Sequence, residues 1–345
     1  MKKDIAFLTL GQAGGNIGKL FESLRFKVLH VNTSQEDLNT LSDAKHVYHI
    51  TGGEGAARDR NRAKELVTAD ILDLQYEITK TLTEEFIFVV FSAGGGTGSG
   101  SGPMMMAYLS EMFPERVICG ITILPAARES IKAQYNAFEC FTELEKLDAG
   151  CLFVIDNNGK PDKFALNDTF VSLFMSMLNM TGYTDKRGNI DVKELKDVLS
   201  AKGIIMVSML PSGQSSTPRL IDSFKNGIFA RPEEDRNVQY IALSMASEIN
   251  TDAFMSVMGT PEDIFQGYNP DATICVLSGL SLPYTKLGEI KALVSEEQAA
   301  ISKVRDVPKP SLLQNSIELK FTKKAEKPKA LMSPNEVLSL FRRQQ

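Results

Sequence analysis

The sequence contains few cysteines and no long apolar run, and each shortage excludes a class of protein. Its four cysteines include no C-x-x-C pair, and Cys119 and Cys151 lie within apolar runs where a thiol packs as a small hydrophobe. This pattern argues against a disulfide framework and favours a reducing, cytoplasmic location. No apolar stretch approaches the ~20 residues that a membrane-spanning helix needs, so no membrane partner is predicted.

Positively charged residues are fewer than negatively charged ones. The 345 residues carry a formal net charge of −5 at pH 7, which argues against a protein whose whole surface binds nucleic acid and leaves room only for a local basic patch. Hydrophobic residues make up 43% of the chain and charged residues 23%, as in an ordinary globular protein with a large core. A chain of this length, without internal repeats, suits two domains that share an interface.

Strand-like apolar runs alternate with helix-length segments through the first half. Each run ends in a loop of Gly, Asn, Thr, Ser or Pro, and this order predicts an α/β fold with a parallel sheet covered by helices. Ligands bind such sheets at the carboxyl ends of the strands, so the chemistry is expected in the loops that follow them. The expected strands are Ile5–Leu10, Val28–Val31, Val47–Ile50, Ile87–Phe91, Val117–Leu124 and Leu152–Ile155.

The second half is less regular. A helix at about 163–180 is expected to lie buried between the domains, because its apolar residues recur at helical spacing. We therefore expect a first domain at 1–180, a smaller α+β domain at 181–322 and a basic tail at 323–345. The elements expected in the smaller domain are the strands Ile204–Leu210, Val238–Met245, Thr273–Leu277 and Ser316–Phe321, and the helices Arg219–Phe229 and Pro283–Lys303.

Two glycine-rich loops follow the first and fourth expected strands. Gly11–Gly18 fails the dinucleotide motif G-x-G-x-x-G, because Ala13 takes the second glycine position, and it lacks the Gly-Lys-Ser/Thr of a Walker A loop. Ser92–Gly100 holds six Gly or Thr residues in nine positions, directly before a helix expected to start near Pro103. Backbone N–H groups in such loops form nests for oxyanions, so a polyphosphate held between two helix N-termini is predicted.

Neither glycine loop contains a lysine. The charge of a polyphosphate is therefore expected to be balanced by helix dipoles and by Mg²⁺, held mainly by phosphates and water with Gln12 or Asp59 nearby. The pair His46 and His49 invites a metal site, but residues three apart in a strand point to opposite faces. No metal site built from protein ligands alone is predicted.

These loops carry a family resemblance. Gly94–Gly100 matches the tubulin signature GGGTGSG letter for letter, and Gly11–Gly18 resembles the first nucleotide loop of tubulin and of the bacterial division tubulin FtsZ. The resemblance continues in order to about Phe321, and the chain is identified as a member of the tubulin/FtsZ superfamily. It implies a tubulin-like fold with a GTP-binding domain, a central helix and an activation domain. It also implies a GTPase that polymerisation activates.

The resemblance further implies which residues bind GTP or GDP. The segment 52–58 resembles the loop that senses the γ-phosphate, 125–129 the loop near the ribose, and 156–158 the loop whose Asn reads guanine. Asn167 and Asp168 resemble a second base-reading pair, although by position they also suit a helix cap. The implied residues are Gly11, Gln12, Ala13, Gly14, Gly15, Asn16, Asn32, Thr33, Gly55, Ala56, Ala57, Gly94, Gly95, Gly96, Thr97, Gly98, Ser99, Glu129, Asn157, Phe164, Asn167 and Asp168.

The segment Gly188–Glu194 resembles the family's synergy loop, N-x-D-x-x-D/E. Asp191 and Glu194 are three apart and share one face at a helix start, where acidic residues also fit without any catalytic role. In the family this loop enters the active site of the next subunit of a head-to-tail filament. The resemblance therefore assigns catalysis to Asp191 and Glu194, which orient and polarise the attacking water.

Two further features bear on the biological role. Division tubulins carry an Arg a few residues after the Glu of the ribose loop, and here Ala133 stands at that spacing. The Gly-Ala-Ala-Arg at 55–58 and the basic tail resemble those of TubZ proteins, tubulin-like filaments of plasmids and phages that segregate DNA through a DNA-binding adaptor. This implies that the tail binds an adaptor and that DNA is bound only indirectly.

Several alternatives are weighed against this interpretation. Within the superfamily they are a cell-division ring GTPase and a phage-centring tubulin, and the tail is the best discriminator. An NAD-dependent Rossmann oxidoreductase fails on Ala13 and gives no use for Gly94–Gly100. A non-hydrolysing structural homologue is opposed by Asp191 and Glu194.

Overall fold

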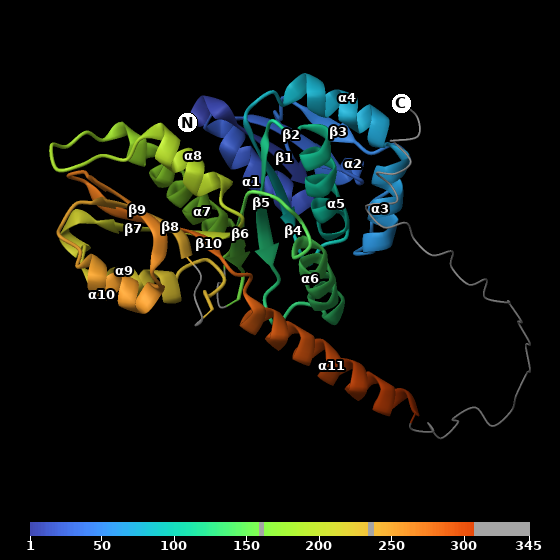
Figure 1. Ribbon diagram of the computed structural model, residues 1–345. Helices are drawn as coiled ribbons and strands as arrows, with labels where there is room; N and C mark the ends of the chain where they lie inside the picture. The colour runs from blue at the N-terminus through green and yellow to red at the C-terminus, as the bar shows by residue number, and fades with distance from the viewer. Residues whose placement is uncertain (159–161, 234–237, 307–345) are drawn as a thin grey trace, which may run out of the picture.

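The computed structural model describes residues 1–158, 162–233 and 238–306 (Figure 1). In the first half, all six expected strands are present, with ends that differ from expectation by at most one residue. The elements are β1 (Ile5–Leu10), α1 (Gly11–Ser23), β2 (Lys27–Asn32), α2 (Gln35–Asn39), β3 (Val47–His49), α3 (Arg60–Ala69), α4 (Ile71–Thr81), β4 (Phe86–Ser92), α5 (Thr97–Met112), β5 (Val117–Leu124), α6 (Ile131–Leu144), β6 (Cys151–Asp156) and α7 (Lys163–Asn179).

The second half contains more elements than the sequence pattern predicts. They are α8 (Val192–Ser200), β7 (Gly203–Pro211), α9 (Thr217–Lys225), β8 (Val238–Met245), α10 (Thr251–Met258), β9 (Pro261–Tyr268), β10 (Ala272–Leu280) and α11 (Tyr284–Asp306). The helix expected to reach Phe229 ends at Lys225, because Phe229 instead forms a bridge with Ile155 of β6. The expected strand at 316–321 and the tail from Lys323 lie outside the described residues.

A single ten-stranded sheet runs through the molecule in the order β3-β2-β1-β4-β5-β6-β7-β10-β8-β9. The strands from β3 to β7 pair in parallel, whereas β10 runs antiparallel to both β7 and β8. Because β6 pairs with β7, the sheet continues across the expected boundary at residue 180, and the division into domains stays a prediction. After β1 the chain builds β2 and β3 on one side and then β4 on the other. Parallel sheets leave a ligand crevice at such a switch point.

Aromatic packing fixes the helices on the sheet. Phe7 of β1 stacks on Phe21 of α1 at a centroid distance of 3.9 Å, and Phe174 of α7 meets Phe88 of β4 edge-on at 5.3 Å. The helices α3, α5 and α6 pack on one another, as Figure 1 shows on the right of the molecule. The carboxyl ends of β1 and β4 are thereby held between rigid helices, and these ends carry the two glycine loops.

Two sequence expectations concern the surroundings of the protein. All four cysteines are buried and form no disulfide with one another, and burial raises the pKa of the Cys140 thiol to about 12. They therefore act as small core residues. Among the residues given a structure, no helix has the length and apolar character to cross a membrane.

Candidate functional site

A cavity of about 530 Å³ lies at the switch point of the sheet. It brings together the N-termini of α1 and α5, the loop at 55–58, the start of α6 and the start of α7. Sixteen of the predicted nucleotide-binding residues share this cavity, although they come from six separate segments. The wall consists of Leu10, Gly11, Gln12, Ala13, Asn16, Ser34, Asp37, Gly55, Ala56, Ala57, Arg58, Ser92, Gly94, Gly95, Gly96, Thr97, Gly98, Ile123, Glu129, Asn157, Lys163, Phe164 and Asn167.

Six predicted residues do not line the cavity. Two of them support residues that do line it: Asn32 bonds both Ser34 and Asp37, at 3.2 and 3.1 Å, and the Thr33 hydroxyl is 2.7 Å from that of Thr97. The Ser99 hydroxyl donates to the carbonyl of Gly95 and so is directed into the helix, not toward a ligand. The six residues are Gly14, Gly15, Asn32, Thr33, Ser99 and Asp168.

The helix α5 begins at Thr97, not near Pro103 as expected. Several glycines of the signature therefore lie inside the helix and serve packing. A Cβ added at Gly100 would lie 2.5 Å from the carbonyl oxygen of Arg60, and one at Gly102 would lie 2.6 Å from the Phe91 ring. The density of glycine thus has a packing cause as well, and the predicted anion nest is confined to the turn before Thr97 and the first turn of α5.

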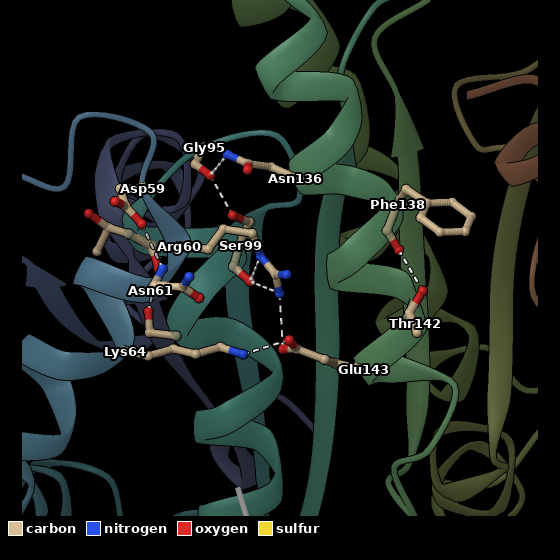
Figure 2. A network of polar contacts seen from close by, with 12 residues as sticks. Asp59, Arg60, Asn61, Lys64, Gly95, Ser99, Asn136, Phe138, Thr142 and Glu143 are labelled. Carbon is tan, nitrogen blue, oxygen red and sulfur yellow. Dashed lines mark hydrogen bonds and ion pairs between the residues drawn. The ribbon is translucent and has the colours of Figure 1, made fainter. Parts of the chain in front are cut away.

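Pro103 removes one backbone hydrogen bond inside α5. A proline has no N–H, so the carbonyl of Ser99, four residues earlier, loses its helical donor. The Arg60 guanidinium replaces that donor, with Nε and Nη2 at 3.2 and 3.0 Å from the Ser99 oxygen. Figure 2 shows this contact, together with the ion pair between Arg60 and Glu143 of α6. The first turn of α5 is therefore tied to α3 and α6 by these polar contacts.

Two cations on the cavity wall were not among the predicted site residues. Arg58 follows Ala57, and both have left-handed backbones with φ of 60° and 44°. The Arg58 guanidinium donates to the hydroxyl of Ser130, the N-cap residue of α6. Lys163, at the start of α7, pairs with Glu129 at 2.7 Å. The expectation that helix dipoles and a metal ion balance the charge of a polyphosphate stays a prediction, and Arg58 and Lys163 add two cations on the same wall.

The opposite end of the cavity suits a flat base. Phe164 exposes 68% of its surface beside Asn157 and Asn167, which are both buried. The cap of α7 is Asp162, whose carboxylate accepts from the N–H groups of Phe164 and Ala165. Asn167 and Asp168 are therefore not the helix cap that their position alone suggested. Ala133, which stands at the spacing of the family's arginine, is buried, and a Cβ added at Gly94 would lie 3.3 Å from the Ala133 Cβ.

Oxygen donors for a metal ion are present on the wall. Gln12 and Asp37 both line the cavity, and an amide or carboxylate oxygen suits a Mg²⁺ that keeps water and phosphates as its other ligands. Asp59 instead caps α3, accepting from the N–H groups of Asn61 and Arg62 at 2.9 and 3.2 Å. Asp37 had no distinguishing motif in the sequence, because only the fold brings α2 to the cavity.

Asp191 and Glu194 lie at the other end of the sheet from the cavity. They form a capping box at the start of α8, with each carboxylate accepting from the other residue's backbone N–H at 2.8 and 2.9 Å. One turn later, Lys196 pairs with Glu85, which precedes β4. The cavity follows β4, and seven residues of strand span roughly 20 Å. Within one subunit, the predicted catalytic pair therefore does not meet the cavity.

Known proteins agree with this geometry. Residues 4–160 match the model of the "Tubulin/FtsZ family, GTPase domain". The chain is 27% identical over 305 residues to the tubulin-like protein TubZ of Clostridium botulinum C phage, covering 86% of this chain and 84% of that one. It is 26% identical over 285 residues to the tubulin-like protein CetZ of Pyrococcus abyssi, covering 75% of each chain.

Solved structures give the same result. The crystal structure of Clostridium botulinum phage c-st TubZ superposes with a TM-score of 0.78 at 26% identity, covering 87% of this chain and 100% of that one. The GTPγS-form protofilament of Bacillus thuringiensis serovar israelensis TubZ has a TM-score of 0.77, covering 89% and 95%. At 16% identity, the second comparison shows the fold alone.

Residues 4–160 therefore form a GTPase domain of the tubulin/FtsZ family, on a tubulin-like α/β fold that continues through the second half. Within that family, the relatives that resemble most of the chain include TubZ proteins. The family and the GTPase activity expected from the sequence are confirmed for this domain, and the expected fold class is confirmed.

Proposed function

We propose that this protein is a cytomotive filament GTPase that binds GTP in the cavity at the switch point and hydrolyses it between two stacked subunits. The observation that carries the proposal is the separation of the two halves of the chemistry. The glycine turns of α1 and α5 line the cavity, whereas Asp191, which is exposed, and Glu194, which is half-buried, lie near the amino ends of the strands. A head-to-tail stack brings the two halves together.

The polyphosphate would lie against the N-termini of α1 and α5. Unpaired N–H groups and the helix dipole favour negative charge there, and Arg58 adds a full positive charge on the same wall. The base would stack beside Phe164, within reach of Asn157 and Asn167, and the sugar would face Glu129. These assignments follow the family resemblance, and the shared cavity supports them.

Hydrolysis would use the carboxylates of Asp191 and Glu194 of the next subunit. In the capping box, Glu194 Oε2 and Asp191 Oδ1 accept backbone N–H groups, which fixes the orientation of both carboxylates. The second oxygen of each group is then available to accept hydrogen bonds from water. A water held in this way is oriented toward the terminal phosphate, and general-base action of this kind contributes typically ~10²–10⁴ to a rate.

A bound Mg²⁺ would neutralise phosphate charge and polarise the transferred phosphoryl group. Gln12 and Asp37 are the wall residues with oxygen atoms suited to it, directly or through water. Arg58 and Lys163 remain as the cations that the chain itself supplies. Arg58 and Lys163 would thus balance part of the phosphate charge directly, and the ion held near Gln12 and Asp37 would balance the rest.

Filament formation is supported by the relatives. Solved TubZ structures from Bacillus thuringiensis include a GTPγS-form protofilament and a two-stranded filament, and CetZ2 from Haloferax volcanii forms a GTPγS-bound protofilament. We propose the same head-to-tail assembly here. We further propose that the filament segregates plasmid or phage DNA in the cytoplasm through a DNA-binding adaptor, which the phage origin of one TubZ relative supports.

The tail at 323–345 is the proposed adaptor-binding element. It carries a net charge of +4, which leaves −9 on the rest of the chain, and such segregation of charge is typical of an interaction segment. A cell-division ring or a phage-centring filament remains the alternative role. The tail distinguishes them, since only the segregation role requires it to capture an adaptor bound to centromere DNA.

The proposal is tested by electron microscopy of the purified protein with GTP, GDP and GTPγS, alongside calorimetry with GTP, ATP and NAD. We expect filaments with GTP and GTPγS, fewer or none with GDP, and heat of binding only with guanine nucleotides. Filaments that form equally well without any nucleotide would contradict the nucleotide-dependent assembly. Binding of NAD would revive the oxidoreductase alternative.

A further inference from the structure

The helix α6 places a buried amide side chain beside the turn that precedes α5. Asn136 is fully buried, and its Nδ2 lies 2.9 Å from the carbonyl oxygen of Gly95 and 3.0 Å from that of Arg58. The carbonyl of Gly94 is within 3.4 Å of the same nitrogen. One side chain thereby connects the loop at 55–58 with the turn before α5, and Figure 2 shows its contact with Gly95.

These contacts determine where the neighbouring N–H groups point. In a trans peptide the C=O and the following N–H point in opposite directions, and the structure has no cis peptide among the described residues. Holding the carbonyls of Gly94 and Gly95 toward Asn136 turns the N–H groups of Gly95 and Gly96 away from α6. Both glycines line the cavity. Neither N–H has a hydrogen-bond partner in the portion of the chain given a structure.

A second contact from α6 holds the other end of the same turn. The Arg60 guanidinium satisfies the Ser99 carbonyl that Pro103 leaves open, and Glu143 fixes the guanidinium at 3.0 Å. Lys64 binds the second oxygen of Glu143, so the carboxylate is held from two sides. α6 therefore restrains the turn before Thr97 through Asn136 and the first turn of α5 through Glu143.

We propose that Asn136 is a positioning residue for the polyphosphate: it aims the N–H groups of Gly95 and Gly96 at the phosphates beyond the first. This inference rests on the proposed nucleotide site and adds a residue of α6 to it. The ligand class that benefits is a nucleoside di- or triphosphate. A nucleoside monophosphate, which has one phosphate, gains little.

The test compares affinities for GTPγS and GMP, measured by calorimetry below the concentration at which filaments form. Asn136→Leu keeps the side-chain volume but removes both donors. We expect it to weaken GTPγS binding by about tenfold or more, the effect of losing an oriented hydrogen bond, and GMP binding by less than about threefold. Thr142→Val on the same helix removes a hydroxyl that donates to the helix carbonyl of Phe138, and it should leave both affinities unchanged.

A role in folding alone would lower the melting temperature without changing the ratio of the two affinities. Equal weakening of GTPγS and GMP, or unchanged GTPγS binding by folded Asn136→Leu, overturns the inference. Asn136→Ser, whose single short hydroxyl reaches at most one carbonyl, provides the same readout if the leucine variant does not fold. A wild-type protein that binds neither nucleotide would overturn the proposed function itself, which separates the two failures.

Discussion

Replacing Arg60 with methionine should destabilise the protein through two identifiable losses. Arg60 is buried, with about 7% of its surface exposed, and its guanidinium serves both the Ser99 carbonyl and the Glu143 carboxylate. Methionine fills the space of the aliphatic stem but donates no hydrogen bond. The carbonyl of Ser99 then has no donor, because Pro103 cannot supply one.

The magnitude follows from these contacts. Breaking a buried ion pair typically costs ~3–5 kcal/mol, but Glu143 is partly exposed and keeps Lys64, so the low end or less applies. An unsatisfied buried carbonyl adds ~1–3 kcal/mol. We therefore expect a loss of about 3 kcal/mol in the free energy of unfolding, and a melting temperature lower by roughly 4 °C.

The proline offers a specific rescue. Pro103→Ala restores an N–H four residues after Ser99, so the helix can satisfy that carbonyl by itself. In the Arg60→Met background, Pro103→Ala should recover about 1 kcal/mol more than it does in the wild-type background. The matched control is Arg62→Met, on the same helix, whose exposed pair with Glu65 at 3.8 Å should contribute little.

Thermal and urea unfolding without nucleotide provide the assay. If Arg60→Met is no less stable than Arg62→Met, the buried contacts do not carry the energy assigned to them. If Pro103→Ala has the same effect with and without Arg60, the guanidinium does not replace the missing helical donor. Either result refutes the reasoning about the first turn of α5.

Three further predictions concern catalysis, acid stability and the tail. Glu194→Ala should keep GTP binding and assembly but lower turnover by ~10²–10⁴. Lys193→Ala, which changes the exposed neighbouring residue, should leave turnover unchanged. Near wild-type turnover in Glu194→Ala would refute the synergy-loop assignment. Burial lowers the pKa of His30 to about 4, so the unfolded chain binds a proton from about pH 6.5 downward that the folded chain does not; the unfolding temperature should fall between pH 6.5 and 4, and a flat profile would contradict this. Deletion after Lys323 should leave polymerisation and GTP turnover intact and abolish capture of an adaptor–centromere complex; loss of polymerisation would show that the tail serves filament contacts.

The parallel sheet was predictable because its strands are nearly continuous apolar runs. β1 and β4 are buried along almost their whole length, and such runs bounded by turn residues stand out in a sequence. The strand β9 was missed because it lies at the sheet edge, pairs only with β8 among the described strands and alternates few apolar residues. The short helix α10 was also missed, although Asn250 is a good N-cap signal.

The start of α5 shows why local pattern reading fails near a site. Glycine and serine have low helix propensity, so the segment from Thr97 to Gly102 did not resemble a helix. A tertiary contact compensates for that preference, because Arg60 supplies the donor that Pro103 lacks. The hydroxyls of Ser99 and Ser101 are satisfied locally by carbonyls one turn earlier, but the Arg60 contact is not visible from spacing along the chain.

The residues of the site also fall into those with a sequence motif and those without one. The glycine turns and base-end residues that line the cavity carry motifs, and their convergence follows from the ends of the strands. Asp37, Lys163 and Asn136 carry no motif, because their relation to the cavity depends on how α2, α7 and α6 pack. For Asp191 and Glu194 a motif was visible but its meaning was ambiguous, because a capping box and a catalytic pair share one pattern. The capping box is present in the structure.

The central claim is that one subunit holds the nucleotide and the next supplies the carboxylates. It is tested most directly by the rate of GTP hydrolysis per subunit, measured over a wide range of protein concentration, with pelleting of filaments followed in parallel. The account predicts little turnover in dilute protein and a steep rise in specific activity at the concentration where filaments appear. A specific activity that stays constant from dilute monomer to filament would contradict it.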